Sequence, residues 1–231
     1  MRARDDPELI YFFNLFKPRG MGYKTFASMN VAIIGATKTT EVLAEKLADA
    51  GHEVLIAVKE NGRQINEQLL ELYDNINVYG IAEAAALADI IIIACISPEV
   101  REIAYLLDDV RHKVIVDCTI TVSMDAEQEV NTMNAIRAIT GSAHVVKCFN
   151  AQKYKHLLQP LFNGVPIDFF VAGDSKKAKE AVKILSKDMD VLNCYDFGGN
   201  DEIAFLDAMA RCWYEYTKTY GVVHPLVLAK K

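Results

Sequence analysis

The sequence predicts an α/β fold built on a doubly wound parallel sheet. Short runs of apolar, mostly β-branched residues alternate with stretches of helical periodicity along the chain. Several of the apolar runs are continuous, as expected for strands that are covered on both faces. Because parallel neighbours need right-handed crossover connections, strand–helix–strand repetition favours this fold. The 231 residues, 52% of them hydrophobic, suffice for one such domain with a small appendage.

The expected elements follow from these runs in chain order. Strands are expected at 30–35, 53–58, 76–80, 90–95, 113–118, 144–149 and 167–173. Helices are expected at 38–50, 63–73, 98–110, 126–139 and 175–189, and a long last helix within 198–221. Gly51 is a typical helix stop, Pro98 suits a first helical turn and Asp174 suits an N-cap.

We divide the chain into three parts. Residues 1–28 are an N-terminal extension, 29–150 a dinucleotide-binding domain, and 151–231 a C-terminal extension that completes the sheet and the substrate cleft. The first part contains the apolar stretch "LIYFFNLF" and is interpreted as a tail or an upstream start. The alternative is a segment that docks on a partner or on the domain itself.

Charge and cysteine content narrow the class of protein. A net charge of -6 with interspersed signs gives no reason to expect nucleic acid or a membrane surface as a partner. No run is long enough for a membrane span, the N-terminus lacks a signal-peptide pattern, and no metal site is apparent, so a cytoplasmic location is expected. The cysteines form no CxxC pair and fit reduced, buried thiols, with a redox or nucleophilic role for Cys118 or Cys148 as the alternative.

Candidate site residues follow the ends of the predicted strands. In a doubly wound sheet, ligands bind outside the carboxyl ends of the strands, where the strand order reverses. The stretch "VAIIGATKTT" leads from a strand through one glycine into a helix, as in a nucleotide-binding loop. The residues at the strand ends are Gly35, Thr37, Lys38, Thr39, Thr40, Lys59, Arg63, Ser97, Pro98, Thr119 and Asn150.

Several segments together resemble a known family. "MNVAIIGATKTTEVLAEKLADAGHEVLIAV", "IIIIACISPEVREI", "KVIVDCT", "HVVKCFN", "FFVAGDSKKAKEAVKIL" and "YDFGGN" are similar, in order and spacing, to the NADP-dependent reductases of the deazaflavin coenzyme F420 and their relatives. These relatives include the ferric-reductase domains of membrane metalloreductases. The resemblance covers about residues 29–220. It implies a Rossmann-like fold and a hydride moved between NADPH and a deazaflavin or flavin.

The resemblance also implies where the cofactor lies. Its adenosine diphosphate would lie near Gly35, Lys59 and Arg63, with the residues at 37–40, and its nicotinamide near Ser97, Pro98, Thr119 and Asn150. Val58 and Lys59 stand where relatives that select NADP carry Ser-Arg, and Arg63 follows four residues further on, so NADP is favoured over NAD if a dinucleotide binds.

The glycine loop departs from the family pattern. Of G-x-G-x-x-G only Gly35 is present, and Thr37 and Thr40 replace the other two glycines. Three interpretations of these threonines are open. They can be read as side chains that crowd a former pyrophosphate loop, as phosphate ligands that act together with Lys38, or as simple caps of the helix. Glu41 suits the helix dipole but repels a phosphate.

Two hypotheses therefore stand. The first is an NADP-dependent oxidoreductase, and the second is a non-catalytic relative that senses a nucleotide or binds a protein. No residue is identified as an acid, base or nucleophile, and His52, His112 and His144 are interpreted as structural or solvated. The last helix carries apolar residues at helical spacing, from Ile203 to Tyr214, and is expected to bury them against the core or in a homodimer.

Overall fold

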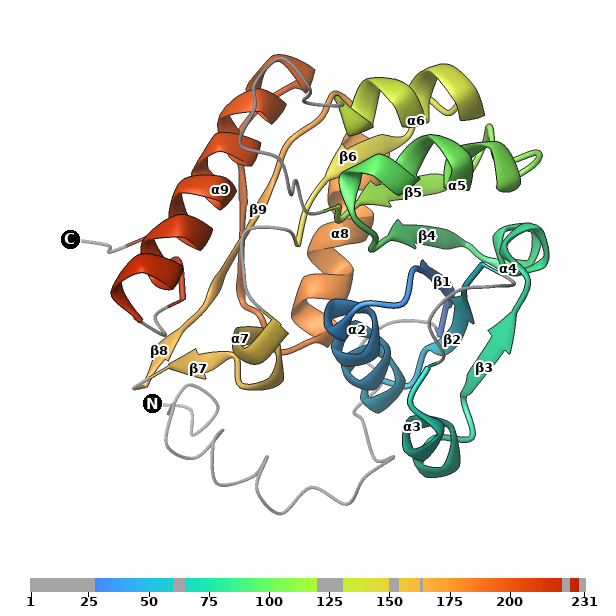
Figure 1. Ribbon diagram of the computed structural model, residues 1–231, viewed down its shortest axis with the longest axis horizontal. Coiled ribbons are helices and arrows are strands. Elements are labelled where there is room, and N and C mark those ends of the chain that lie inside the picture. The colour runs from blue at the N-terminus through green and yellow to red at the C-terminus, as the bar shows by residue number, and fades with distance from the viewer. Residues whose placement is uncertain are drawn as a thin grey trace, which may run out of the picture.

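The predicted doubly wound sheet is confirmed. The computed structural model describes residues 28–59, 65–119, 131–149, 154–162, 164–221 and 225–228. Its main sheet has six parallel strands in the order β3-β2-β1-β4-β5-β6 (Figure 1). Their bounds are β1 Asn30–Ile34, β2 Glu53–Ala57, β3 Ile76–Tyr79, β4 Ile90–Ile93, β5 Val114–Asp117 and β6 Val145–Lys147. The order reverses between β1 and β4, so this is the switch point at which such sheets bind ligands.

Helices cover both faces of this sheet. They are α2 Lys38–Asp49, α3 Glu67–Leu72, α4 Ile81–Leu87, α5 Val100–Leu106, α6 Thr132–Thr140, α7 Tyr154–Leu158, α8 Lys176–Asp188 and α9 Ile203–Tyr220. Val31 and Ile33 of β1 pack in a core shared with α2 and α8. Ala32 and Ile34 pack on the other face, in a core shared with α4, α5, α6 and α9. This two-sided burial explains why the strand sequences are continuously apolar.

The chain after β6 forms smaller sheets. β9 Asp168–Val171 and β10 Asn193–Asp196 make a parallel pair of their own, and β7 Leu161–Phe162 pairs with β8 Val165–Pro166. An isolated antiparallel bridge between Lys147 and Ala172 connects β6 to the end of β9. The strand expected at 167–173 therefore exists, but the assigned strand lies in a separate pair rather than in the main sheet.

Other differences from the expected elements are local. α4 and β10 were not expected, and the helix expected at 98–110 is a 3₁₀ turn, Ser97–Glu99, followed by the shorter α5. Ser175, not Asp174, is the N-cap of α8, because its hydroxyl accepts a hydrogen bond from the Ala178 N–H at 3.2 Å. Asp174 instead accepts from the Asn200 N–H at 2.9 Å.

Some expectations fall partly outside the described residues. These are the extension up to residue 27, the start of the helix expected at 63–73 and most of the first half of the helix expected at 126–139. In the described ranges, no helix combines the length and apolar character that crossing a membrane requires.

Gly35 is required by the close approach of β1 and β4. Its φ is +140°, and a Cβ added there would lie 2.3 Å from the carbonyl oxygen of Ala94. The one glycine kept from the family pattern is thus explained by packing between neighbouring strand ends.

We expect Gly35→Ala to lower the free energy of unfolding by about 2–3 kcal/mol, because it combines backbone strain with a steric clash. Urea unfolding measures this change. Gly80→Ala is the matched control, since a Cβ at Gly80 would meet nothing within 4 Å. Equal losses in both variants would contradict the packing role of Gly35.

Candidate functional site

The first turn of α2 is closed by its own threonines. The Thr40 N–H donates to Thr37 Oγ1 at 3.2 Å, and the Thr37 N–H donates to Thr40 Oγ1 at 3.2 Å, which forms a capping box. Thr37 Oγ1 also donates to the carbonyl oxygen of Ala94 at 3.2 Å. The side chains at the altered glycine positions therefore cap the helix and attach it to the end of β4. The N–H groups of Lys38 and Thr39 in the same turn take no part in the capping box.

Two lysines at the carboxyl edge of the sheet are held by carboxylates. Lys38 Nζ lies 2.5 Å from Glu41, and Lys59 Nζ lies 2.5 Å from Glu102 and 3.7 Å from Glu99. The hydrogen bond to Glu102 raises the pKa of Lys59 despite an opposing effect of desolvation. The side chains of Lys38 and Lys59 are 49% and 28% exposed. Exposed pairs of this kind are worth only about 0–1 kcal/mol, so each lysine can exchange its partner for another anion.

The structure brings together predicted residues from several strand ends. Thr37 and Thr40, after β1, contact Ala94 at the end of β4. Lys59, after β2, reaches Glu99 in the turn that also contains Ser97 and Pro98. Ser97 is buried and Pro98 is exposed. Arg63 and Asn150 lie outside the described residues.

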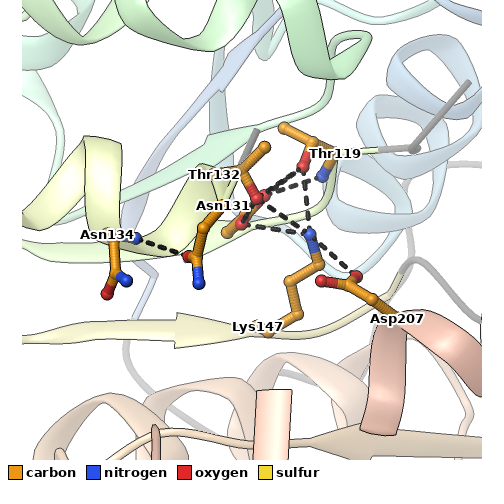
Figure 2. Close-up of polar contacts among 7 residues, drawn as sticks. Thr119, Asn131, Thr132, Asn134, Lys147 and Asp207 are labelled. Carbon is orange, nitrogen blue, oxygen red and sulfur yellow. Dashed lines mark hydrogen bonds and ion pairs between the residues drawn. The ribbon is translucent and has the colours of Figure 1, made fainter. Parts of the chain in front are cut away.

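A buried lysine network lies at the carboxyl ends of β5 and β6 (Figure 2). Lys147 Nζ is 3.1 Å from Asp117 Oδ2, 3.1 Å from Asp207 Oδ1 and 3.0 Å from Thr119 Oγ1. Thr132 Oγ1 accepts from the same ammonium at 3.2 Å and donates to Asp117 Oδ2 at 2.5 Å. We call these five residues, Asp117, Thr119, Thr132, Lys147 and Asp207, the lysine hub.

The hub keeps a full positive charge inside the protein. Lys147 and Asp117 have no exposed surface. Burial by itself lowers the pKa of Lys147, but the attraction of Asp117 and Asp207 outweighs it and raises that pKa above the ordinary value of 10.5. The stabilising charge is therefore fully present below that ordinary value and is lost only as the pH rises above it.

The hub also changes the interpretation of Thr119. Its hydroxyl donates to Asp117 Oδ1 at 2.6 Å and accepts from Lys147, and its side chain is fully buried. Thr119 therefore holds the end of β5 in place. Sequence reasoning missed Lys147 and Asp207 as site residues. The available signal was the lysine inside the apolar run "HVVKCF", since a buried lysine needs an anionic partner.

The remaining candidates are structural. Burial raises the pKa of the Cys118 thiol to about 12, which argues against a nucleophilic role for this cysteine. His52 accepts from the Met29 N–H at 3.3 Å and contacts Asp188 at 3.2 Å, and His144 contacts the Ser175 hydroxyl at 3.1 Å. Among the described residues, no cluster of three or more His, Cys, Asp or Glu could hold a metal ion.

Comparison with known proteins confirms the resemblance that the sequence shows. Residues 30–121 match the model of the family "NADP oxidoreductase coenzyme F420-dependent". The chain is 26% identical over 198 residues to the F420-dependent NADP reductase of Methanothermobacter thermautotrophicus, an alignment that covers 78% of this chain and 85% of that protein.

Solved structures share the fold. A structure from Arthrobacter sp. FB24, named as a candidate F420-dependent NADP reductase, is 21% identical with a TM-score of 0.75, over 88% of this chain and 100% of the other. The V8 variant of the imine reductase from Myxococcus stipitatus, in complex with NAD+, is 17% identical with a TM-score of 0.60, over 84% of this chain and 62% of the other.

We expect Lys147→Met to lower the free energy of unfolding by about 3–5 kcal/mol at neutral pH, because it leaves Asp117 buried without its cation. Urea unfolding measures the loss. Lys183→Met is the control, since the pair of Lys183 with Glu180 is solvent-exposed and its removal should cost about 0–1 kcal/mol. A cost for Lys147→Met no larger than that of the control would show that the hub does not stabilise the fold.

Proposed function

We propose that the protein is an NADP(H)-dependent oxidoreductase that transfers a hydride between NADPH and a deazaflavin such as coenzyme F420, or a flavin. The matching family model and the reductase from Methanothermobacter thermautotrophicus support the reaction class. NADPH supplies the hydride when it is bound, and the protein binds and orients the two coenzymes.

The observation that carries the proposal is the grouping of anion-binding elements at the switch point. The N-terminus of α2 points a helix dipole and the N–H groups of Lys38 and Thr39 toward the carboxyl edge of the sheet. Lys38 adds a cation there, and Lys59 follows the neighbouring strand β2. These groups fit a phosphorylated dinucleotide, although the side chains of Thr37 and Thr40 occupy the place of glycine.

Each candidate residue then receives a role. Gly35 and the residues at 37–40 lie on the diphosphate side, and Lys59 with Arg63 on the side of the 2′-phosphate. Ser97, Pro98 and Asn150 are assigned to the nicotinamide side, with Thr119 supporting them from the lysine hub. In this assignment Glu102 competes with the 2′-phosphate for Lys59.

We expect NADPH to bind more tightly than NADH, and Lys59→Ala to remove most of that difference. Glu102→Gln should strengthen NADPH binding by about 1 kcal/mol, because it frees Lys59 from a charged competitor. Calorimetry at one salt concentration measures the affinities of the unchanged protein and of each variant for the two nucleotides. Lys183→Ala is the control, because Lys183 also has a raised pKa and a glutamate partner but lies on α8.

Equal affinities for NADPH and NADH in the unchanged protein would remove the assigned role of Lys59. If neither NADPH nor NADH binds, the result would favour the non-catalytic relative over the enzyme.

The double change Thr37→Gly/Thr40→Gly tests the loop. If the threonines only crowd the diphosphate, NADPH binding should strengthen by about 1–3 kcal/mol, the scale of one or two hydrogen bonds to a charged group. Loss of the capping box should lower stability by about 1 kcal/mol, which urea unfolding measures separately. Weaker NADPH binding by the double variant would instead indicate that the threonine hydroxyls are phosphate ligands.

We further propose a cytoplasmic homodimer. The five cysteines are free thiols, which suits a reducing compartment. In the first turns of α9 the side chains of Ile203 and Leu206 are buried. Further along the helix, the side chains of Tyr214, Tyr216 and Tyr220 are exposed. The start of the expected stripe is therefore buried in the core, and the second half of α9 offers an aromatic face for a second copy. Light scattering should give twice the mass of the chain.

A further inference from the structure

Two energetically unfavourable features lie next to each other at the carboxyl end of β6. Lys147, the last residue of the strand, is a fully buried ammonium that needs carboxylate partners. Two residues further on, Phe149 is buried and has a φ of +66°. The other non-glycine residues with positive φ in the described part of the chain are aspartates, which adopt this conformation more easily than phenylalanine does. Because backbone strain and buried charge both gather at functional sites, a functional role is expected at this strand end.

Asp207 is the carboxylate through which the lysine hub reaches the surface. Its side chain is 16% exposed, whereas those of Lys147 and Asp117 have no exposed surface. Figure 2 shows Asp207 on α9 pointing toward the Lys147 ammonium, and the distance from Nζ to Oδ1 is 3.1 Å. An ammonium this close favours the ionised form of the acid. The hub therefore holds a fixed negative charge at the edge of the candidate site.

A dinucleotide in the proposed site would have its nicotinamide on the side of the hub. Doubly wound sheets bind dinucleotides across the point where the strand order reverses, with one half of the ligand on each side. Lys59, after β2, assigns the adenosine half to the β1–β2 side. The nicotinamide half then lies toward the ends of β4, β5 and β6, and the last residue of β6 is Lys147. This step rests on the proposed function.

We propose that Asp207 makes the site prefer the oxidised nicotinamide ring to the reduced one. The reduced ring of NADPH is neutral, whereas the oxidised ring of NADP+ carries one positive charge, because the hydride removes two electrons and one proton and passes to the acceptor. A fixed carboxylate nearby attracts the charged ring and has no net charge to attract in the neutral ring. Asp207 is thus a residue that determines which redox form of the nucleotide binds more tightly.

Other charges nearby change the size of the local potential but not the sign of this effect. Arg211, for example, lies one turn beyond Asp207 on α9. Contributions to the potential add, so neutralising Asp207 removes a negative contribution whatever charge Arg211 supplies. The phosphates and the adenine are the same in both redox forms. The ratio of the two affinities therefore reports on the surroundings of the nicotinamide ring.

The test variant is Asp207→Asn, because the amide oxygen can still accept from Lys147 while the negative charge is removed. NADP+ should lose roughly three- to tenfold more affinity than NADPH, the scale of a charge interaction that water partly screens. Calorimetry with each nucleotide, at neutral pH and one low salt concentration, measures the ratio of the two dissociation constants. Asp207→Glu keeps the charge and should keep the ratio. Asp207→Ser is a second neutral variant and should shift the ratio in the same direction, so the test does not depend on the folding of one variant.

Asp188→Asn is the matched control. The Asp188 side chain is 6% exposed and contacts His52 at 3.2 Å. Because His52 directly precedes β2, this pair lies at the amino edge of the sheet, opposite the candidate site. The control also removes one partly buried carboxylate, but it should leave the ratio unchanged. A loss of stability in any variant would lower both affinities together and would not change their ratio.

An unchanged ratio in the neutral Asp207 variants, with both nucleotides still bound, would overturn the role of Asp207 and leave the proposed function standing. An equal shift of the ratio in Asp188→Asn would overturn it as well, because the effect would not be local. If the unchanged protein bound neither NADP+ nor NADPH, this proposal would be refuted together with the proposed function.

Discussion

The buried charge of Lys147 is the constraint on which the arrangement of the carboxyl edge depends. An ammonium with no exposed surface must recover the free energy of its lost hydration from nearby anions and hydroxyls. Its partners come from the end of β5, the start of α6 and the face of α9, which are far apart in the sequence. Meeting this requirement fixes where β5 and β6 end relative to α9. It also connects the C-terminal part to the main sheet. The backbone bridge between Lys147 and Ala172 strengthens the same connection.

The edge that is proposed to bind the nucleotide follows a different principle, because its polar groups are satisfied by weak local partners. The capping box occupies Thr37 and Thr40, and carboxylates occupy Lys38 and Lys59. A glycine-rich loop leaves its N–H groups open to a diphosphate, whereas this loop must exchange internal contacts for those of a ligand. In the proposed function, this exchange would lower the net affinity for the nucleotide but leave the helix dipole and both cations available. Selectivity between the two nucleotides would then depend on the competition between Glu102 and a phosphate for Lys59.

α9 extends from the core on one face of the sheet to the surface. Its first turns bury Ile203 and Leu206, and Asp207 reaches the hub from the next position. Beyond these turns the helix carries an aromatic row, in which Trp213 and Tyr216 are stacked with ring centroids 5.5 Å apart and Tyr216 and Tyr220 are tilted with centroids 4.9 Å apart. The same helix thus anchors the C-terminal part through Asp207 and presents the aromatic surface of the proposed dimer.

The sequence by itself determined the class of fold and the edge of the sheet that holds the candidate site. Continuous β-branched runs such as "IIIIAC" can be buried only between two layers, and Gly35 marks the turn where β1 meets α2. The sequence left open whether Thr37 and Thr40 cap or crowd the loop, because a hydroxyl's role depends on which N–H lies within its reach. It also could not show that Lys147 meets Asp207, since no local pattern links residues so far apart. Tertiary structure decided this contact, because a buried charge takes its properties from neighbours that only the folded chain brings together.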